Sequence, residues 1–458
     1  MWRSQLWILS LSILLSSSCH AASLRVKEEN NSVKTSVFLT PPFVLKHGLV
    51  QDKVYFDIPF PRGHIALKSF TAEVVDGNGD SIPLHETYLH HWVLERYYGQ
   101  KAVKDDDLAR IIMVRNSGVC RNIGQYYGLG PETRKTSTWV PDPYGIEVGN
   151  LNEVPEGYEE RWLMNVHVID TRKVEDRLGC IECKCSLYNV TSDEYGRQLA
   201  NGYMGGLHCC YDETQCRVEE GFGDGGERKL YLRYTLKWIE WSPRIIPVKI
   251  YILDVTATRD LPTGLNFVNP SYSCKVEYNI PSCDSVAEDN GECVDVRKTK
   301  LVISHGGDII YGAAHQHTGG VGSAMYGEDG RLLCSFNPIY GEGEEAGDEA
   351  GYIVGMSTCY PNPGSVNIRD GELLTLVSNY SNLRMHVGAM GFFYILLAEP
   401  QPKLTSFLSQ ELTVPRIADL MEQWWVLLLA GGLVMAIAVA AIYRRRKEGD
   451  GGYDRIVN

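Results

Sequence analysis

The sequence lacks the short motifs that mark several common enzyme classes. It contains no G-x-S-x-G nucleophile elbow, no P-loop and no H-E-x-x-H pair. Hydrolase, nucleotide-binding and zincin interpretations therefore have no support. Basic residues are also in deficit, since 44 Lys and Arg against 57 Asp and Glu give a net charge of −13. Such a surface repels phosphate backbones, so we expect no nucleic-acid partner.

Long apolar runs are missing from the body of the chain and occur only near its ends. Residues 1–22 have a basic start, a short apolar run and small residues, which predicts a signal peptide. Residues 424–443 contain no charge and are long enough to cross a bilayer as a helix. Four basic residues follow at once, which places the 444–458 tail in the cytosol and the N-terminus outside. We expect a single-pass type I membrane protein of the secretory pathway, in the plasma membrane or an endomembrane, with residues 401–423 as a juxtamembrane linker.

Cysteine is absent between Cys19 and Cys120 and again after Cys359. The twelve cysteines from Cys120 to Cys359 are an even number in an oxidising compartment, so up to six disulfides are expected, with a connectivity that spacing cannot reveal. Six of them fall in residues 179–226, which predicts a disulfide-stapled insertion, although zinc sites are an alternative for CIECKC and HCC. Three N-x-[ST] sequons predict a glycoprotein: Asn30, Asn189 and Asn379.

Long helical periodicities are scarce between the leader and the predicted span. The chain instead has many short runs of Val, Ile, Tyr, Phe and Thr bounded by Gly, Pro, Asn and Asp, such as residues 65–75 and 229–238. Regularly spaced runs of this kind are typical of antiparallel β-sandwiches. We therefore predict a mainly β fold.

Five histidines and one methionine form the pattern that carries chemistry. In chain order they are His90, His91, His167, His315, His317 and Met390. Residues two apart point to the same face of a strand, so His315 and His317 can bind one metal. His90 and His91 point to opposite faces and can share a metal only at a bulge or strand end. His167 is the natural third ligand of that pair, and a thioether beside two imidazoles favours copper.

A simpler interpretation exists for each of these residues taken alone. Met390 lies in an apolar run and can be core filler. His167, in an apolar strand-like run, can be a buried histidine with its hydrogen bonds satisfied. The order of the segments, rather than any single residue, argues for a metal site.

Four segments carry a family resemblance: LHHWV, NVHV, HQHTGGVGSAMYGEDG and MGFFYILLAE. In this order they resemble the copper type II, ascorbate-dependent monooxygenases of the peptidylglycine α-hydroxylating and dopamine β-monooxygenase type, over residues 38–399. The leader, the HHW and HQHTGG segments and the C-terminal span resemble the plant stress up-regulated nodulin family. The second resemblance covers the whole chain but supplies no mechanism.

The monooxygenase resemblance implies two jelly-roll-like β-sandwich domains, residues 35–245 and 246–400, with one copper each. His90, His91 and His167 would hold the first copper, which stores an electron. His315, His317 and Met390 would hold the second, where a substrate C–H bond is hydroxylated. Ascorbate would be the reductant, and Tyr394, which those enzymes share, is the candidate catalytic side chain.

Three departures from those enzymes concern the substrate. Ala313 stands where the peptide-hydroxylating relatives have an arginine for the substrate carboxylate, Phe392 replaces an asparagine, and Trp92 replaces a methionine. A planar guanidinium is hard to replace for a carboxylate, which argues against peptidylglycine. The substrate, a small molecule or a peptide, is not identified. The rival hypothesis is a non-enzymatic, stress-related cell-surface glycoprotein that binds a partner or copper.

Overall fold

Alternation of apolar and polar residues produces most of the strands. In β10 (Arg228–Glu240) the side chains are alternately buried and partly exposed over most of the strand, as expected when one face meets the core. By contrast, β24 (Phe392–Ala398), with the sequence FFYILLA, is buried at every position. A continuous apolar run of this length fits a strand that is covered on both faces.

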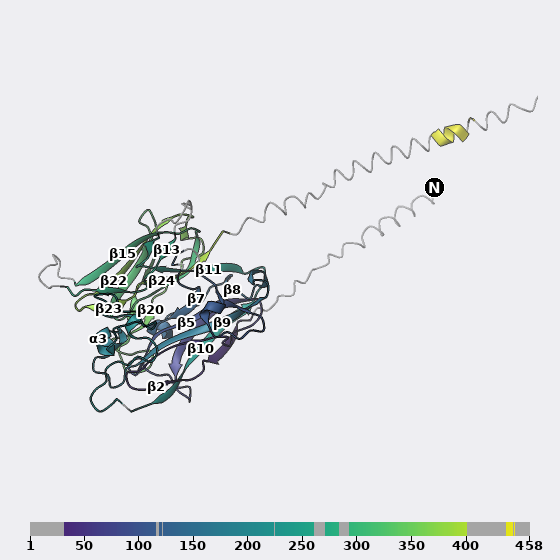
Figure 1. Cartoon of the computed structure of the whole chain (residues 1–458). Helices are drawn as coiled ribbons and strands as arrows, with labels where there is room; N and C mark the ends of the chain where they lie inside the picture. The colour runs from purple at the N-terminus through teal and green to yellow at the C-terminus, as the bar shows by residue number, and fades with distance from the viewer. Residues whose placement is uncertain are drawn as a thin grey trace, which may run out of the picture. The chain divides into compact units, whose positions relative to one another are not determined.

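The computed structural model describes residues 32–115, 119–120, 122–223, 225–260, 271–283, 293–400, 437–442 and 444. Contacts divide the chain into two units, Met1–Glu399 and Pro400–Asn458. Strands make up 48% and helices 8%, which confirms the predicted mainly β class. Figure 1 shows the strands and the few short helices of the first unit.

Among the described residues, the largest sheet has nine strands, which come from both halves of the first unit. Its order is β1 (Lys34–Leu39), β10, β4 (Ile65–Val75), β8 (Tyr144–Val148), β11 (Ile246–Asp254), β24, β16 (Gly307–His315) and β21 (Asn367–Ile368), with β2 (Phe43–Leu45) beside β10. All its pairs are antiparallel except β8 with β11, which is parallel. The predicted boundary between residues 245 and 246 thus falls inside one continuous sheet.

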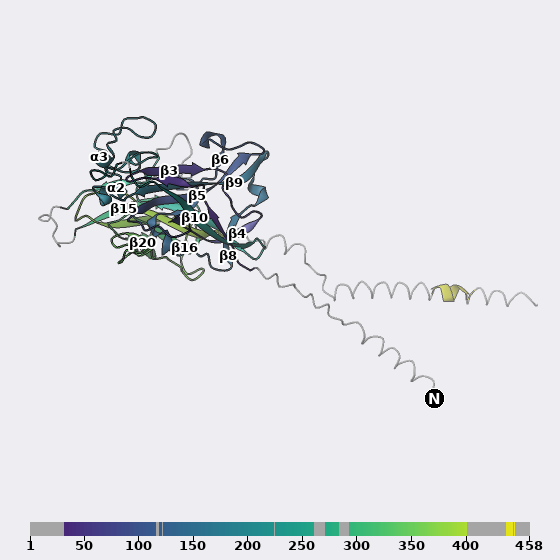
Figure 2. The ribbon, with the colours of Figure 1, turned by 90° about the horizontal axis from the view of Figure 1, so that it is seen from below.

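Two further sheets pack on this one. The five-stranded sheet contains β3 (Val50–Tyr55), β9 (Tyr158–Asp170), β5 (Thr87–Gln100), β6 (Ile112–Met113) and β7 (Tyr126–Leu129). The four-stranded sheet contains β15 (Val294–Val302), β22 (Leu373–Ser381), β17 (Gly320–Tyr326) and β18 (Leu332–Phe336). Figure 2 shows β3, β5 and β9 stacked over β10 and β4.

The remaining elements are short. Three two-stranded sheets pair β12 (Thr258–Arg259) with β13 (Tyr272–Ser273), β14 (Tyr278–Ile280) with β23 (His386–Ala389), and β19 (Pro338–Tyr340) with β20 (Ile353–Met356). In the described part of the first unit, the helices are α2 (Arg177–Ile181), α3 (Cys185–Tyr188) and the 3-10 turns η1 (Leu108–Arg110), η2 (Pro131–Arg134), η3 (Leu151–Glu153) and η4 (Leu207–Cys209).

Two main apolar cores share the strands at the middle of the nine-stranded sheet. Ile250 and Ile252 of β11 belong to the core under the five-stranded sheet, whereas Tyr251 and Leu253 belong to the core under the four-stranded sheet. β24 divides its residues between the two cores in the same alternating way. The middle strands therefore separate the two cores and contact both.

All twelve cysteines from Cys120 to Cys359 form disulfides, as predicted. The six bonds are Cys120–Cys274, Cys180–Cys216, Cys183–Cys210, Cys185–Cys209, Cys283–Cys293 and Cys334–Cys359. Three of them staple the segment between β9 and β10, which carries α2, α3 and η4. All six cysteine sulfurs of this segment are bonded to one another, so none is free to bind zinc and the zinc alternative is wrong there. Six disulfides indicate a domain of the extracellular space or secretory pathway.

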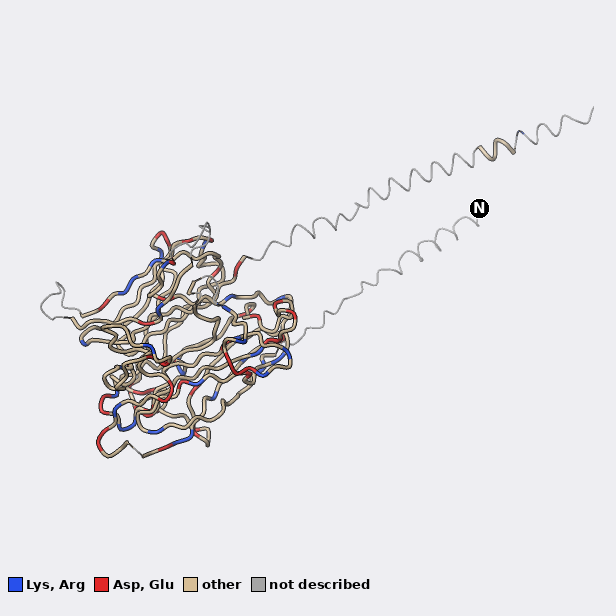
Figure 3. Tube along the Cα trace, in the orientation of Figure 1, with Lys and Arg blue, Asp and Glu red and all other residues tan. Residues whose placement is uncertain are grey.

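Within the described residues, no helix is both long enough and apolar enough to span a membrane. Residues 437–442 and 444 are helical. The rest of the predicted span, the predicted signal peptide and the linker lie outside the described residues. In Figure 3 acidic and basic residues are intermixed along the trace of the first unit.

Candidate metal centre

A β-bulge places two adjacent histidines on the same side of the five-stranded sheet. The pairing of β5 with β9 shifts register between Leu89 and His91, and His91 then lies opposite His167. The predicted bulge is therefore present. One ligand atom from each of His90, His91 and His167 lies within 4.8 Å of the others, which is close enough for a metal to draw them together.

The second pair of histidines lies at the end of β16. His315 is the last residue of the strand, and its ring centroid is 5.1 Å from that of His317. Gln316 between them donates from Nε2 to Ser378 Oγ (2.9 Å) and to the Asn379 carbonyl oxygen (3.0 Å). The two histidine rings are thus neighbours, but His317 lies beyond the end of the strand, so strand alternation does not account for their contact.

The two groups are not separated in space. The rings of His90 and His317 meet edge to face, with centroids 4.8 Å apart and planes at 82°. His90 also stacks on His167 with centroids 4.6 Å apart. We call His90, His91, His167, His315 and His317 the histidine cluster, because each ring contacts at least one other ring of the set.

Two of the cluster histidines are oriented by polar partners. His91 Nε2 lies 2.7 Å from Asn165 Oδ1, and Asn165 Nδ2 donates to Asp52 Oδ1 at 2.7 Å. Because a carboxylate only accepts, this second bond fixes the amide and makes His91 Nε2 the donor. His315 Nδ1 similarly donates to Oε1 of the fully buried Glu132 at 2.7 Å. His91 Nδ1 and His315 Nε2 are therefore the ring nitrogens that remain free to accept a metal.

Buried ring nitrogens without a hydrogen-bond partner occur in the other three histidines. Among the described residues these are His90 Nδ1, both ring nitrogens of His167, and His317 Nε2. An unpaired polar atom costs free energy in a core, so several together call for a ligand. Burial lowers the pKa of His90 and His317 well below the ordinary value, and that of His167 to about 4. The neutral imidazoles that result are the form that binds metal.

The hydroxyl of Tyr380 links the backbone segments that carry His317 and Met390. It accepts a hydrogen bond from the backbone N–H of His317 (2.8 Å) and donates to the carbonyl of Met390 (2.6 Å). Tyr380 itself is fully buried in β22. The predicted thioether ligand and the predicted imidazole ligand are therefore fixed relative to each other by one side chain.

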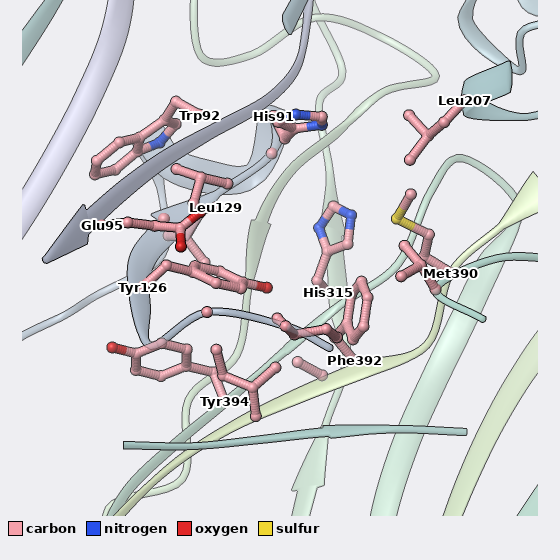
Figure 4. A pocket seen from close by; sticks show the side chains of 18 of the residues that line it. His91, Trp92, Glu95, Tyr126, Leu129, Leu207, His315, Met390, Phe392 and Tyr394 are labelled. Atoms are coloured by element: carbon pink, nitrogen blue, oxygen red, sulfur yellow. The ribbon is translucent and has the colours of Figure 1, made fainter. Parts of the chain in front are cut away.

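A cavity of about 280 Å³ opens beside the cluster. Its walls include His91, His315 and Met390, which Figure 4 shows together with Leu207 from η4 of the stapled segment. The remaining walls are mainly apolar and aromatic, including Trp92, Leu129, Tyr126, Phe392 and Tyr394. His90, His167 and His317 are not among its lining residues. The cluster thus has a cavity-facing side and a buried side.

Two polar groups face the cavity away from the histidines. Burial raises the pKa of Glu95 to about 7, against a weaker opposing effect of Arg115. The hydroxyl of Tyr394, the predicted catalytic side chain, is buried and has no hydrogen-bond partner among the described residues. Both residues line the cavity, and the Tyr394 hydroxyl oxygen itself is buried.

Sequence reasoning missed the residues that orient the ligands. Asn165 carried a usable signal, because it lies two residues before His167 and therefore on the same face of its strand. Glu132 carried none, since it lies in a 3-10 turn far along the chain from His315. His386 is not available as a ligand, because Glu182 and the Ser381 carbonyl occupy its two ring nitrogens.

The structure defines a disulfide-bonded, mainly β protein with a buried histidine cluster beside a cavity. Residues 31–400 match the family described as Stress up-regulated Nod 19, and the chain belongs to that family. This finding confirms the nodulin resemblance. No curated protein matches the sequence.

Likenesses to solved structures are weak. PNGF-II shares 10% identity over 78% of this chain and 62% of its own, with a TM-score of 0.25. The VP2 subviral particle of infectious bursal disease virus shares 9% identity over 80% of this chain and 72% of its own, with a TM-score of 0.17. TM-scores this low carry no argument about fold or function.

Proposed function

We propose that this protein is an extracytosolic, membrane-anchored copper protein that uses ascorbate to hydroxylate a small, largely apolar substrate. Six disulfides support a location in the secretory pathway or outside the cell. The anchor is the predicted span at residues 424–443, which would make the protein type I with the site on the luminal or extracellular side. The proposal keeps the monooxygenase resemblance as its chemical basis.

The convergence of five imidazoles and one thioether beside a cavity carries this proposal. Three of the rings have buried nitrogens without partners, and the other two are oriented by Asn165 and Glu132. This donor set fits copper: imidazole suits both of its oxidation states, and the Met390 thioether favours Cu(I). Histidines that bind a metal usually donate their other ring N–H to a carboxylate, a carbonyl or a water, which orients the ring.

Copper bound at these residues would supply one-electron redox chemistry with dioxygen. The overall reaction balances as substrate C–H plus O₂ plus ascorbate giving substrate C–OH, water and dehydroascorbate. Ascorbate provides the two electrons and two protons that reduce the second oxygen atom. No oxidant other than dioxygen is required.

The side chains around the cavity have separate roles in this proposal. His91, His315 and Met390 form the reactive wall. Trp92 and Phe392 exclude water and contact the apolar part of the substrate. The unpaired Tyr394 hydroxyl and the Glu95 carboxyl offer the polar contacts that set its orientation.

The wall composition also argues against a substrate with a carboxylate. No Lys or Arg is found among the described residues that line the cavity. Ala313, at the position of the relatives' arginine, is fully buried and pairs with Tyr394 of β24. Phe392 lies against His315, with ring centroids 6.3 Å apart. A peptide with a free C-terminal carboxylate would find no cationic partner there.

Copper analysis and oxygen uptake by the purified full-length chain test the proposal. We expect copper to co-purify or to load stoichiometrically, and His317→Ala to abolish substrate-coupled oxygen uptake with ascorbate. His386→Ala is the matched control, because it removes a buried histidine whose nitrogens are already paired. A chain that binds no copper, or one whose turnover survives His317→Ala, would refute the proposal.

A second candidate is a non-enzymatic, stress-related cell-surface glycoprotein that binds copper or a partner. Phe392 and Ala313, which replace substrate-binding residues of the resembled enzymes, favour it. So does the exposed Asn189, a sequon residue in left-handed conformation at the end of α3. Tight copper binding without oxygen uptake in any candidate extract would favour this function over the first.

A further inference from the structure

The histidine cluster has no internal boundary between its two groups. His90 of the first group contacts His317 of the second at a centroid distance of 4.8 Å, closer than His317 lies to His315 at 5.1 Å. His90 is likewise closer to His317 than to its chain neighbour His91, at 5.6 Å. The contact between the groups is therefore as close as the contacts within them.

The cavity does not separate His90 from His317. It is lined by His91, His315 and Met390, whereas the contact between His90 and His317 is on the buried side, where both rings are 4% exposed or less. The charges that orient the cluster are also peripheral, with Asp52 acting through Asn165 and Glu132 behind His315. No solvent-filled space or charged side chain is thus found between His90 and His317 in the described structure.

The unpaired nitrogens point to the same conclusion. His90 Nδ1 and His317 Nε2, on the two rings that meet, both lack hydrogen-bond partners among the described residues. Each nitrogen needs a ligand, and the rings that carry them are in van der Waals contact. Two metal ions held by these rings would be neighbours.

We infer that the histidine cluster holds a single dinuclear copper centre, in which the two metal ions are electronically coupled, instead of two independent mononuclear sites. His90 and His317 are the residues at which the two halves of the centre meet. The inference rests on the proposed copper function and deepens it. It departs from the resemblance, which implies one separate copper in each domain.

Copper content and electron paramagnetic resonance of the full-length Cu(II)-loaded chain test this inference together. We expect two coppers per chain but fewer detected spins than copper ions, with a half-field transition, because coupled Cu(II) ions lose normal signal intensity. We also expect His90→Ala or His317→Ala to remove more than one copper per chain, since each ring supports the shared centre. His386→Ala should leave copper content and spectrum unchanged.

The outcomes separate this inference from the proposed function. Two coppers with full spin intensity, or loss of only one copper in both variants, would overturn the dinuclear centre and leave the copper function intact. A copper content of one ion per chain would also overturn the dinuclear centre and leave the copper function intact. A chain that takes up no copper would overturn both. His317→Gln, which keeps a polar side chain of moderate size, repeats the test if the alanine variant does not fold.

Discussion

His90 and His317 lie in opposite halves of the chain, yet their rings meet edge to face with centroids 4.8 Å apart. Neither residue lies in the other's sheet, since His90 is in the five-stranded sheet and His317 follows β16 of the nine-stranded sheet. The contact arises because the inward faces of both sheets contribute side chains to the same apolar core.

The carboxylate behind His315 should control copper affinity. Glu132→Ala removes the acceptor of the 2.7 Å bond from His315 Nδ1, and we expect copper affinity to fall roughly 10- to 100-fold. Glu132→Gln keeps an acceptor oxygen and should lose less. Competition with a chromogenic chelator measures both. Glu372→Gln is the control: Glu372 is a buried carboxylate paired with Arg331, and its variant should leave copper affinity unchanged.

Tyr380→Phe should weaken both the fold and the site. It leaves the His317 N–H and the Met390 carbonyl without their partner, which costs about 1–3 kcal/mol of unfolding free energy. It also frees Met390 relative to His317, so copper affinity should fall. Tyr234→Phe removes a comparable buried bond, to the Pro59 carbonyl at 2.7 Å, and should lower stability alone. Equal effects of the two variants on copper binding would contradict the assigned role of Tyr380.

Stability should depend on pH through Glu95. Burial raises its pKa to about 7, above the ordinary value of 4.5, so the native state holds a proton that the unfolded chain releases. Native stability from this group is present below about pH 4.5 and is lost as the pH rises through 7. Glu95→Gln removes the effect. The melting temperature of Glu95→Gln relative to wild type should therefore be higher at about pH 8 than at about pH 5.

A matched acidic residue on the surface provides the control for that measurement. The Glu213 side chain is 77% exposed, so Glu213→Gln should shift the melting temperature by the same small amount at both pH values. A Glu95→Gln difference that does not change with pH would show that the carboxyl titrates normally in the folded protein.

The disulfides should differ in their contribution to stability. Cys120–Cys274 closes a separation of 154 residues and Cys334–Cys359 one of 25. The chain-entropy model gives about 5 kcal/mol for the first and about 3.5 kcal/mol for the second. Serine replacement of both partners in each bond, followed by denaturant unfolding, should show the larger loss for Cys120–Cys274. The reverse order would mean that native contacts, rather than loop closure, decide the difference.

Local geometry at the site could be predicted from the sequence. Adjacent His90 and His91 require a bulge to act together, and the register of β5 with β9 shifts there. The rings of His315 and His317 are neighbours, although His317 lies beyond the end of β16 and not in the strand. The cysteine count implied six disulfides. The two histidine pairs involve residues that are close in sequence, and the disulfide count follows from the oxidising compartment.

Long-range relationships could not be predicted in the same way. The contact of His90 with His317 and the bond of Glu132 to His315 join segments whose spacing carries no periodic signal. The parallel pairing of β8 with β11 leaves no pattern in either strand, and the two-domain prediction came from the monooxygenase resemblance. The apolar run of β24 did indicate burial on both faces, but not which core would cover each face.

The middle strands that contact both apolar cores have a mechanical consequence. Because β11 and β24 place alternate side chains in the two cores, and β8 pairs directly with β11, one half cannot rotate against the other without breaking a shared sheet. Separate domains joined by a linker would behave as hinged bodies and melt one after the other. We therefore expect this protein to unfold in one cooperative step. The shared sheet should keep the distance between its two histidine groups fixed.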